Sequence, residues 1–217
     1  IPTAGVPSCH ATAKAKLSAA GASYVQAASW HGLLVQHDSS PTAWLLAPLD
    51  ERVAMLAGKP KGLIDRIIAK SKLTGGARIL AQTMRAHGAF CYLVSGGFEF
   101  LTGPVAIECG FHGHHANYLD HDDNSISGTV RKPILNRQAK VTYLEDYCQL
   151  HDVELGETAS IGDGANDLGM LGQAGFGVAF HGRPILRRKV ALQLNHTNLT
   201  GLLYLQGYKQ EEFVFND

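Results

Sequence analysis

Two carboxylates, Asp163 and Asp167, lie four positions apart in the segment Ile-Gly-Asp-Gly-Ala-Asn-Asp at residues 161–167. A short apolar run precedes the segment, two glycines bracket Asp163, and apolar residues with helical spacing follow from Leu168. This order predicts a strand whose carboxyl end delivers Asp163 into a crevice, with a helix directly behind it. Carboxylates on a tight turn are suitable ligands for a hard cation such as Mg²⁺. A polar turn that binds nothing explains the same residues, so other segments must decide between the two interpretations.

A hydroxyl group and two glycines, Ser95-Gly96-Gly97, follow the apolar residues 90–94, which we predict to form a buried strand. A serine hydroxyl and unobstructed backbone N–H groups at the end of a strand suit an anion such as phosphate. Many ordinary turns have the same composition, so this segment gains weight only in combination with others.

Lys140 lies near the start of a predicted helix over residues 137–151, where a solvated surface lysine is the default interpretation. Within the acidic segment, Asp163 could bind a metal ion and Asp167 could anchor a lysine. Asn166, between them, could donate a hydrogen bond to an oxyanion.

Strands and helices that alternate along the chain must position these residues. We predict strands at residues 32–35, 90–94, 158–161 and 176–180, helices at 51–57, 63–71, 76–87, 137–151 and 199–205, and a hairpin at 117–130. Polar residues follow the strands at their carboxyl ends. This alternation predicts an α/β fold with a doubly wound parallel sheet of the Rossmann type.

The composition excludes several classes of function. The 217 residues contain 19 basic and 19 acidic side chains, and this balance argues against nucleic acid or an anionic membrane surface as a partner. No apolar run reaches the length of about 20 residues that spans a bilayer, and the N-terminus does not resemble a secretory signal. Four cysteines without a CxxC pair suggest free buried thiols, so we expect a cytoplasmic protein. The oligomeric state cannot be inferred from the sequence.

In combination, residues 93–98, Lys140 and residues 161–167 resemble motifs two, three and four of the haloacid dehalogenase superfamily. The resemblance is closer to its phosphoserine phosphatases, through residues 52–58, residues 175–181 and residues 202–208. It runs from about residue 51 to residue 214. It implies a haloacid dehalogenase-like core with a helical cap, and hydrolysis of O-phosphoserine to serine and phosphate in serine biosynthesis.

The resemblance also implies a role for each motif in a two-step phosphoryl transfer through an aspartyl-phosphate, with Mg²⁺ as cofactor. Asp163 would bind Mg²⁺, and Asp167 would hold Lys140 through a charge-assisted hydrogen bond. The residues that would contact the phosphoryl group or substrate are Ser95, Gly96, Lys140 and Asn166, together with Arg52 at the substrate carboxylate.

The first motif of the family, D-x-D-x-T, is not intact in this chain. In one register Asp38 is the nucleophile and a metal ligand, and Ser40 replaces the general acid. In another register Asp38 is the acid and Gln36 replaces the nucleophile, and a third register loses both carboxylates. The first fifty residues could also be unrelated to the motif. We prefer the first register, which predicts a phosphatase slowed by about 10²–10⁴-fold through loss of the acid. The alternative is a catalytically inactive protein that binds a phosphorylated ligand.

We divide the chain into an N-terminal segment at residues 1–31 and a phosphatase domain at residues 32–217, with a shortened cap insert at about residues 43–75. The glutamate with which the family contacts the substrate amine has no counterpart in the shortened insert. A second cluster, the histidines and aspartates of residues 111–123, has a composition suited to a transition metal. Its spacing matches no compact ligand set, and we favour a solvated hairpin.

Overall fold

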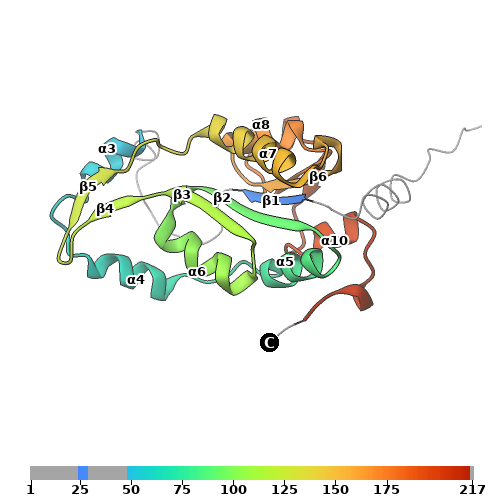
Figure 1. The fold of residues 1–217 in the computed structure, drawn as a ribbon, viewed down its shortest axis with the longest axis horizontal. Coiled ribbons are helices and arrows are strands. Elements are labelled where there is room, and N and C mark those ends of the chain that lie inside the picture. The colour runs from blue at the N-terminus through green and yellow to red at the C-terminus, as the bar shows by residue number, and fades with distance from the viewer. Residues whose placement is uncertain (1–23, 29–47, 216–217) are drawn as a thin grey trace, which may run out of the picture.

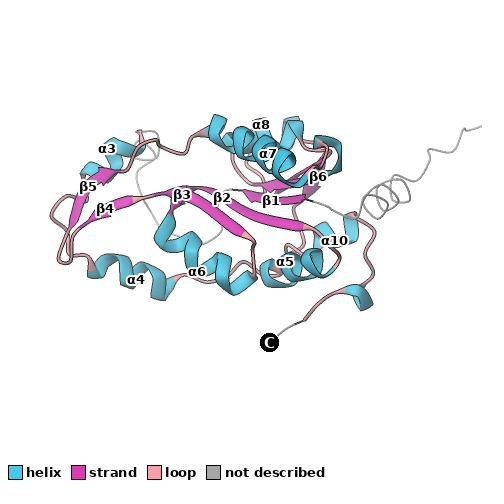
Figure 2. Cartoon of the chain, in the orientation of Figure 1, coloured by secondary structure: helices cyan, strands magenta, loops and turns pink. Residues whose placement is uncertain are grey.

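Short apolar runs form a six-stranded parallel sheet in the computed structural model, which describes residues 24–28 by their backbone and residues 48–215 in full (Figures 1 and 2). The sheet has the order β3-β2-β1-β6-β7-β8, and every neighbouring pair is parallel. Its strands are β1 Tyr24–Ala28, β2 Phe90–Phe98, β3 Gly113–Asn117, β6 Thr158–Gly162, β7 Phe176–Phe180 and β8 Leu192–Leu194. Strand β6 is buried along its whole length because helices cover both faces of the sheet.

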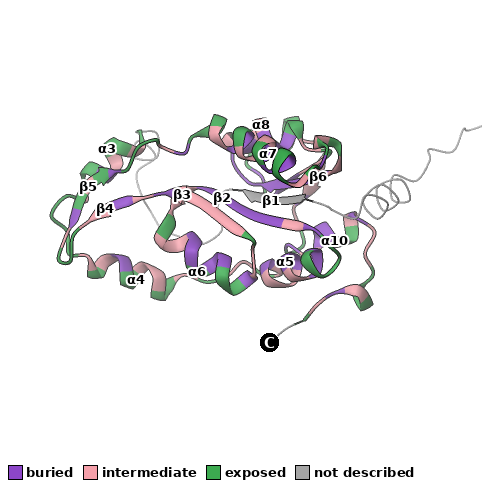
Figure 3. Cartoon of the chain, in the orientation of Figure 1, coloured by how far each residue is buried: buried purple, intermediate pink, exposed green. Residues whose placement is uncertain are grey.

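Helices cover both faces of the sheet with separate apolar layers. On one face lie α5 Ala77–Ala86, α6 Glu99–Cys109 and α10 Gly201–Leu205, which supply Met84, Val105 and Leu202 to the larger core. On the other face lie α7 Arg137–His151, α8 Leu168–Gln173 and α9 Pro184–Lys189, which supply Leu144, Met170 and Leu186 to a second core. The buried stripes of these helices face the sheet in Figure 3. The predicted α/β fold with a doubly wound parallel sheet is confirmed.

A smaller lobe lies beyond the carboxyl ends of β1 and β2 (Figure 1). It consists of α3 Leu49–Ala54, α4 Gly62–Lys70 and an antiparallel hairpin of β4 Leu119–His121 and β5 Ile126–Val130. Val53, Ile64 and Ile126 form its apolar centre. Gly128 has a φ of +80°, and a Cβ there would lie 2.7 Å from the Cβ of Ala57. Only glycine therefore allows the turn after α3 to approach β5 this closely. The lobe combines the predicted helical insert with the predicted hairpin.

Several elements differ from the sequence prediction. The helix at residues 137–151 and the strand at residues 176–180 are confirmed with the predicted bounds. Strand β3 and helix α6 were not predicted. The strand predicted at residues 32–35 lies outside the described residues, and the central strand of the sheet is Tyr24–Ala28. The sheet therefore extends upstream of residue 32, where we predicted the phosphatase domain to begin. Sequence reasoning preferred Gly-Leu-Leu-Val to the less apolar Tyr-Val-Gln-Ala-Ala.

Three cysteines in the described part of the chain, Cys91, Cys109 and Cys148, are free and buried, as predicted. Burial raises the pKa of the Cys91 thiol to about 12 and that of Cys109 to about 11, so neither is a reactive thiolate at neutral pH. Among the helices of the described ranges, none combines the length and apolar character needed to cross a membrane.

Candidate phosphate and metal site

The strand order reverses at β1, because the chain continues from β1 to β2 on one side and adds β6 on the other side. In open α/β sheets, ligands bind in the crevice at such a switch point, outside the carboxyl ends of the strands. Ala28 pairs with Val94, and Ala27 pairs with Ile161. Ser95 on β2 and Asp163 after β6 therefore each lie one residue beyond the position that is level with Ala28, the last residue of β1. The topology brings two predicted site residues to the two sides of this crevice.

The turn after β6 is closed by the side chain of Asp167. Its Oδ2 accepts hydrogen bonds from the backbone N–H groups of Asp163, at 3.1 Å, and Gly164, at 3.0 Å. A Cβ on Gly162 would lie 2.6 Å from the Asp167 carboxyl group, so the folded-back carboxylate requires glycine at that position. Asp167 is fully buried, in the 3₁₀ turn η2 Ala165–Asp167 that precedes α8. The local sequence thus fixes Asp163 at the end of β6.

Lys140 extends from the first turns of α7 towards this carboxylate. Asn136 caps the helix by accepting a hydrogen bond from Ala139 N–H at 3.0 Å. Lys140 Nζ donates to Asp167 Oδ1 at 2.6 Å, and the side chains are 1% and 0% exposed. The predicted contact is present, and the surface-lysine interpretation is wrong because α7 packs this face against the sheet. Burying two charges costs several kcal/mol per ion. Such a pair contributes little net stability, so a functional role would explain why it is kept.

Asp163 has unmet bonding capacity. The residue is 8% exposed, and within the described ranges no hydrogen-bond donor reaches its Oδ1. Burial, and then repulsion from Asp167, raise the pKa of Asp163 to about 6, although Lys140 partly offsets both. A buried oxygen without a partner calls for an explanation such as an ion. Mg²⁺ is commonly bound by one or two carboxylates with water and substrate phosphate. The residues present therefore fit this cation.

Ser95 lies on the opposite side of the crevice, on β2. It is fully buried, and its Oγ accepts a hydrogen bond from Gly97 N–H at 3.0 Å. A hydroxyl group that accepts one hydrogen bond can still donate its own hydrogen. The β2–β3 pairing shifts register between Val94 and Phe98, so residues 95–97 leave the regular ladder. This arrangement provides a hydroxyl donor on an irregular stretch of β2, which is separated from β6 and its acidic turn by β1 alone.

The remaining predicted residues lie in three places. Asn166 belongs to η2, with its Oδ1 beside Gly164. Arg52 lies on α3, in the smaller lobe, and is partly exposed. Asp38 lies outside the described residues. Sequence reasoning missed Arg183, whose backbone N–H donates to Asp163 O at 3.0 Å and whose charge lowers the pKa of Asp163. The signal was a basic residue just after the carboxyl end of β7.

The histidine-rich segment forms ordinary structural contacts. His112 Nδ1 accepts a hydrogen bond from Cys91 N–H at 3.0 Å, and His114 Nδ1 lies 3.1 Å from Thr102 Oγ1. Asp122 accepts backbone hydrogen bonds from Ser125 and Asn124 in the hairpin turn. No group of three or more histidine, cysteine or acidic side chains suited to a metal occurs in the part of the chain that the structure describes.

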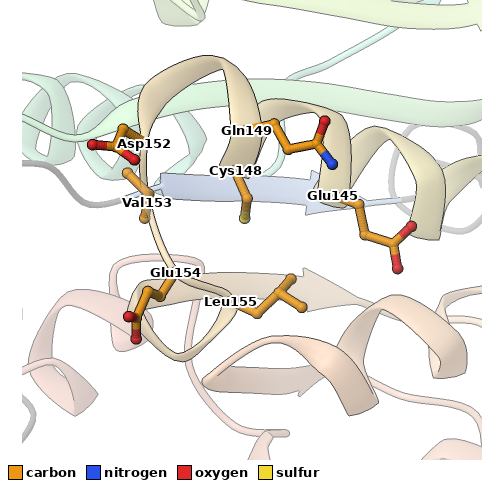
Figure 4. A pocket seen from close by; sticks show the side chains of 7 residues that line it. All are labelled: Glu145, Cys148, Gln149, Asp152, Val153, Glu154 and Leu155. Carbon is orange, nitrogen blue, oxygen red and sulfur yellow. The ribbon is translucent and has the colours of Figure 1, made fainter.

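A cavity of about 360 Å³ lies at the other end of the sheet (Figure 4). It is formed by the C-terminal half of α7 and the loop leading into β6, whereas Lys140 lies in the first turns of α7. Its lining residues are Glu145, Cys148, Gln149, Asp152, Val153, Glu154 and Leu155. None of the predicted site residues lines it, so it is separate from the crevice.

Comparisons with known proteins show which family the chain belongs to. Residues 24–172 match the family model described as haloacid dehalogenase-like hydrolase. The chain is 38% identical over 169 residues to a phosphoserine phosphatase of Mycobacterium tuberculosis, across 78% of this chain and 41% of that protein. It is 35% identical over 151 residues to the phosphoserine phosphatase of Streptococcus thermophilus, across 70% of both chains. It spans about two fifths of the length of the relatives from M. tuberculosis and Streptomyces coelicolor.

Solved structures of phosphoserine phosphatases are similar to this chain in fold. A phosphoserine phosphatase described as a phospho-aspartyl intermediate analogue superposes with a TM-score of 0.69 at 29% identity, across 72% of this chain and 75% of that one. A substrate-bound phosphoserine phosphatase complex superposes with a TM-score of 0.74 at 23% identity, across 83% of this chain and 97% of that one, which supports the fold alone. The chain belongs to the phosphoserine phosphatase family of haloacid dehalogenase-like hydrolases.

Proposed function

We propose that this chain is a Mg²⁺-dependent phosphatase that hydrolyses O-phosphoserine through an aspartyl-phosphate. The observation that carries the proposal is the buried pair of Lys140 and Asp167, beside Asp163 with its unsatisfied Oδ1. The pair costs desolvation free energy that its mutual attraction offsets only in part, and a phosphate bound by Lys140 would explain why a lysine at 1% exposure is kept here. The phosphoserine class comes from the relatives, which are phosphoserine phosphatases.

Each residue has a distinct task in this proposal. Ser95, the Gly96 N–H and Lys140 hold phosphoryl oxygens where negative charge develops during transfer. Asp167 fixes the direction of the Lys140 side chain through a charge-assisted hydrogen bond. Asp163 holds Mg²⁺, which neutralises phosphate charge when it is bound.

Two further residues complete the proposed substrate contacts. Asn166, in the turn beside Asp163, contacts the phosphoryl group or substrate. Arg52 pairs with the substrate carboxylate, for which its forked guanidinium group is suited.

Asp38 is the proposed nucleophile. Residues 29–49, from the end of β1 to the start of α3, contain this single carboxylate. Attack by its carboxylate oxygen on phosphorus breaks the bond to the serine oxygen, and water then hydrolyses the aspartyl-phosphate. Ser40 stands two positions later and is a poor acid near neutral pH, so we expect protonation of the leaving serine oxygen to be slow.

Phosphate release from O-phosphoserine tests the proposal. The rate is measured with MgCl₂ and with EDTA, for the wild type and for Lys140→Ala. We expect release that requires Mg²⁺ and falls by about 10²–10³-fold in the variant, the usual effect of losing one group that stabilises transition-state charge. Wild-type release that does not exceed the variant's would rule out the phosphatase.

One observation favours a second candidate, an inactive protein that binds a phosphorylated ligand. The positions that directly follow β1 in the sequence are Ser29, Trp30 and His31, and none of them is a carboxylate. Asp38 comes ten positions after Ala28, the last residue of β1. Calorimetry with phosphoserine, phosphate and Mg²⁺ distinguishes the two candidates, because Lys140-dependent binding without turnover supports only the second.

A further inference from the structure

Asn117 connects two segments that hold the proposed phosphate ligands. It is the last residue of β3 and is 2% exposed. Its side-chain Nδ2 donates to Gly96 O at 3.0 Å, and its Oδ1 accepts from Leu135 N–H at 2.7 Å. One amide group therefore binds the backbone of the Ser95-Gly96-Gly97 loop and the backbone that leads into α7.

The irregular β2–β3 pairing explains why a side chain is needed here. His115 pairs with Val94 and Asn117 with Phe98, so β2 has three residues between these pairs where β3 has one. The loop of residues 95–97 therefore departs from the ladder. Gly96 is partly buried, and a carbonyl group shielded from water destabilises the fold when it lacks a hydrogen-bond partner. The Asn117 amide supplies the hydrogen bond to Gly96 O that a regular ladder would supply.

The second hydrogen bond reaches the entrance of α7. Leu135 is buried and directly precedes Asn136, the N-cap of the helix whose first turns carry Lys140. The Asn117 amide thus lies between the loop that presents Ser95 and the helix that presents Lys140. Residues 131–136 form the linker between β5 and α7. A second contact, from Arg131 N–H to Tyr118 O at 2.9 Å, holds this linker beside the hairpin. Loss of the amide would consequently not detach the linker.

We infer that Asn117 is a positioning residue, which sets the loop of Ser95 and Gly96 relative to Lys140 so that both contact one phosphate group. The inference rests on the proposed function, because it requires that these groups share a phosphate. Asn117 itself contacts two backbone segments, and it acts on phosphate only through them.

Inorganic phosphate binding in the presence of MgCl₂, measured by calorimetry, tests the inference. Asn117→Leu removes both hydrogen bonds at similar volume. Thr83→Val is the matched control, because Thr83 is fully buried and its Oγ1 accepts one backbone hydrogen bond, from Val214 N–H at 2.8 Å, at the C-terminal segment. Misplacing one of two charge-assisted contacts should weaken phosphate binding by at least about tenfold in Asn117→Leu, and by less than about twofold in Thr83→Val. Equal effects of the two variants would overturn the inference.

Asn117→Asp separates positioning from general damage. The ionised carboxylate accepts from Leu135 N–H but cannot donate to Gly96 O, whereas the protonated form can do both. We expect its phosphate affinity, relative to wild type at each pH, to recover as the pH falls, and a flat ratio would contradict the inference. This variant also serves if Asn117→Leu does not fold.

Hydrogen exchange distinguishes failure of the inference from failure of the proposed function. Without any ligand, Asn117→Leu should speed exchange in residues 95–97 and residues 131–136 together, whereas Thr83→Val should change neither segment. If exchange changes in this way but the wild type binds no phosphate, the proposed function fails and the connection between the two segments stands. Unchanged exchange would overturn the connection itself.

Discussion

The buried pair of Lys140 and Asp167 allows a quantitative prediction about Asp167→Asn. Asparagine keeps an oxygen that can accept from Asp163 N–H and Gly164 N–H, so the substitution removes the charge and the hydrogen-bond acceptor opposite Lys140. Breaking a buried ion pair from one side costs about 3–5 kcal/mol because the remaining charge stays buried. The side chains are 1% and 0% exposed, so solvent screening is small. We expect the free energy of unfolding to fall by about this amount.

Equilibrium urea unfolding at pH 7 measures the loss, and Lys140→Met/Asp167→Asn provides the internal control. The double variant removes both charges, so it should recover at least about 2 kcal/mol of the loss in Asp167→Asn, within the range of couplings between contacting residues. A loss below about 1 kcal/mol for Asp167→Asn, typical of an exposed pair, would refute the reasoning. So would a double variant less stable than Asp167→Asn.

Three further predictions concern other groups in the protein. The folded state raises the pKa of Asp163 from 3.8 to about 6, so ionisation of this carboxyl group destabilises the metal-free protein by about 3 kcal/mol above pH 6. Asp163→Asn should therefore raise the melting temperature at pH 7. The variant should also abolish the rise in melting temperature that MgCl₂ causes in the wild type. Gly162→Ala would put a Cβ 2.6 Å from Asp167 and should cost about 1–3 kcal/mol in urea unfolding, whereas Gly156→Ala, with open space around its Cβ, should cost less than half of that. Burial lowers the pKa of His151 below its ordinary 6.5, so the folded state favours the neutral imidazole. The stability that the neutral ring contributes is therefore present above pH 6.5 and is lost on acidification. Between pH 7 and pH 5, the free energy of unfolding should fall less in His151→Phe than in the wild type, as measured by urea unfolding.

Elements with a strong local pattern could be predicted from the sequence. Helix α5 has apolar residues along one side and lies within the predicted residues 76–87, and the strand of residues 176–180 is a short apolar run. Helix α6 was missed because Gly103-Pro104 lies within it, and proline removes a helical N–H. Strand β3 was missed because Gly-His-His-Ala-Asn does not alternate apolar and polar residues, and its position depends on pairing with β2.

The candidate site was predicted in part, for a physical reason. Asp163 and Ser95 follow apolar strands directly, so the topology rule for parallel sheets places them at one crevice. The burial of Lys140 could not be read from its own helix, because its partner Asp167 is 27 residues away in the sequence. Asn117 gave no signal, because its role depends on two backbone groups contributed by other segments.

A crystal structure with MgCl₂ and inorganic phosphate would test the central claim most directly. We predict Mg²⁺ at about 2.0–2.1 Å from a carboxylate oxygen of Asp163, with phosphate oxygens within hydrogen-bond distance of Ser95 Oγ and Lys140 Nζ. Phosphate bound away from these residues, or Mg²⁺ absent from Asp163 at saturating concentration, would contradict the account.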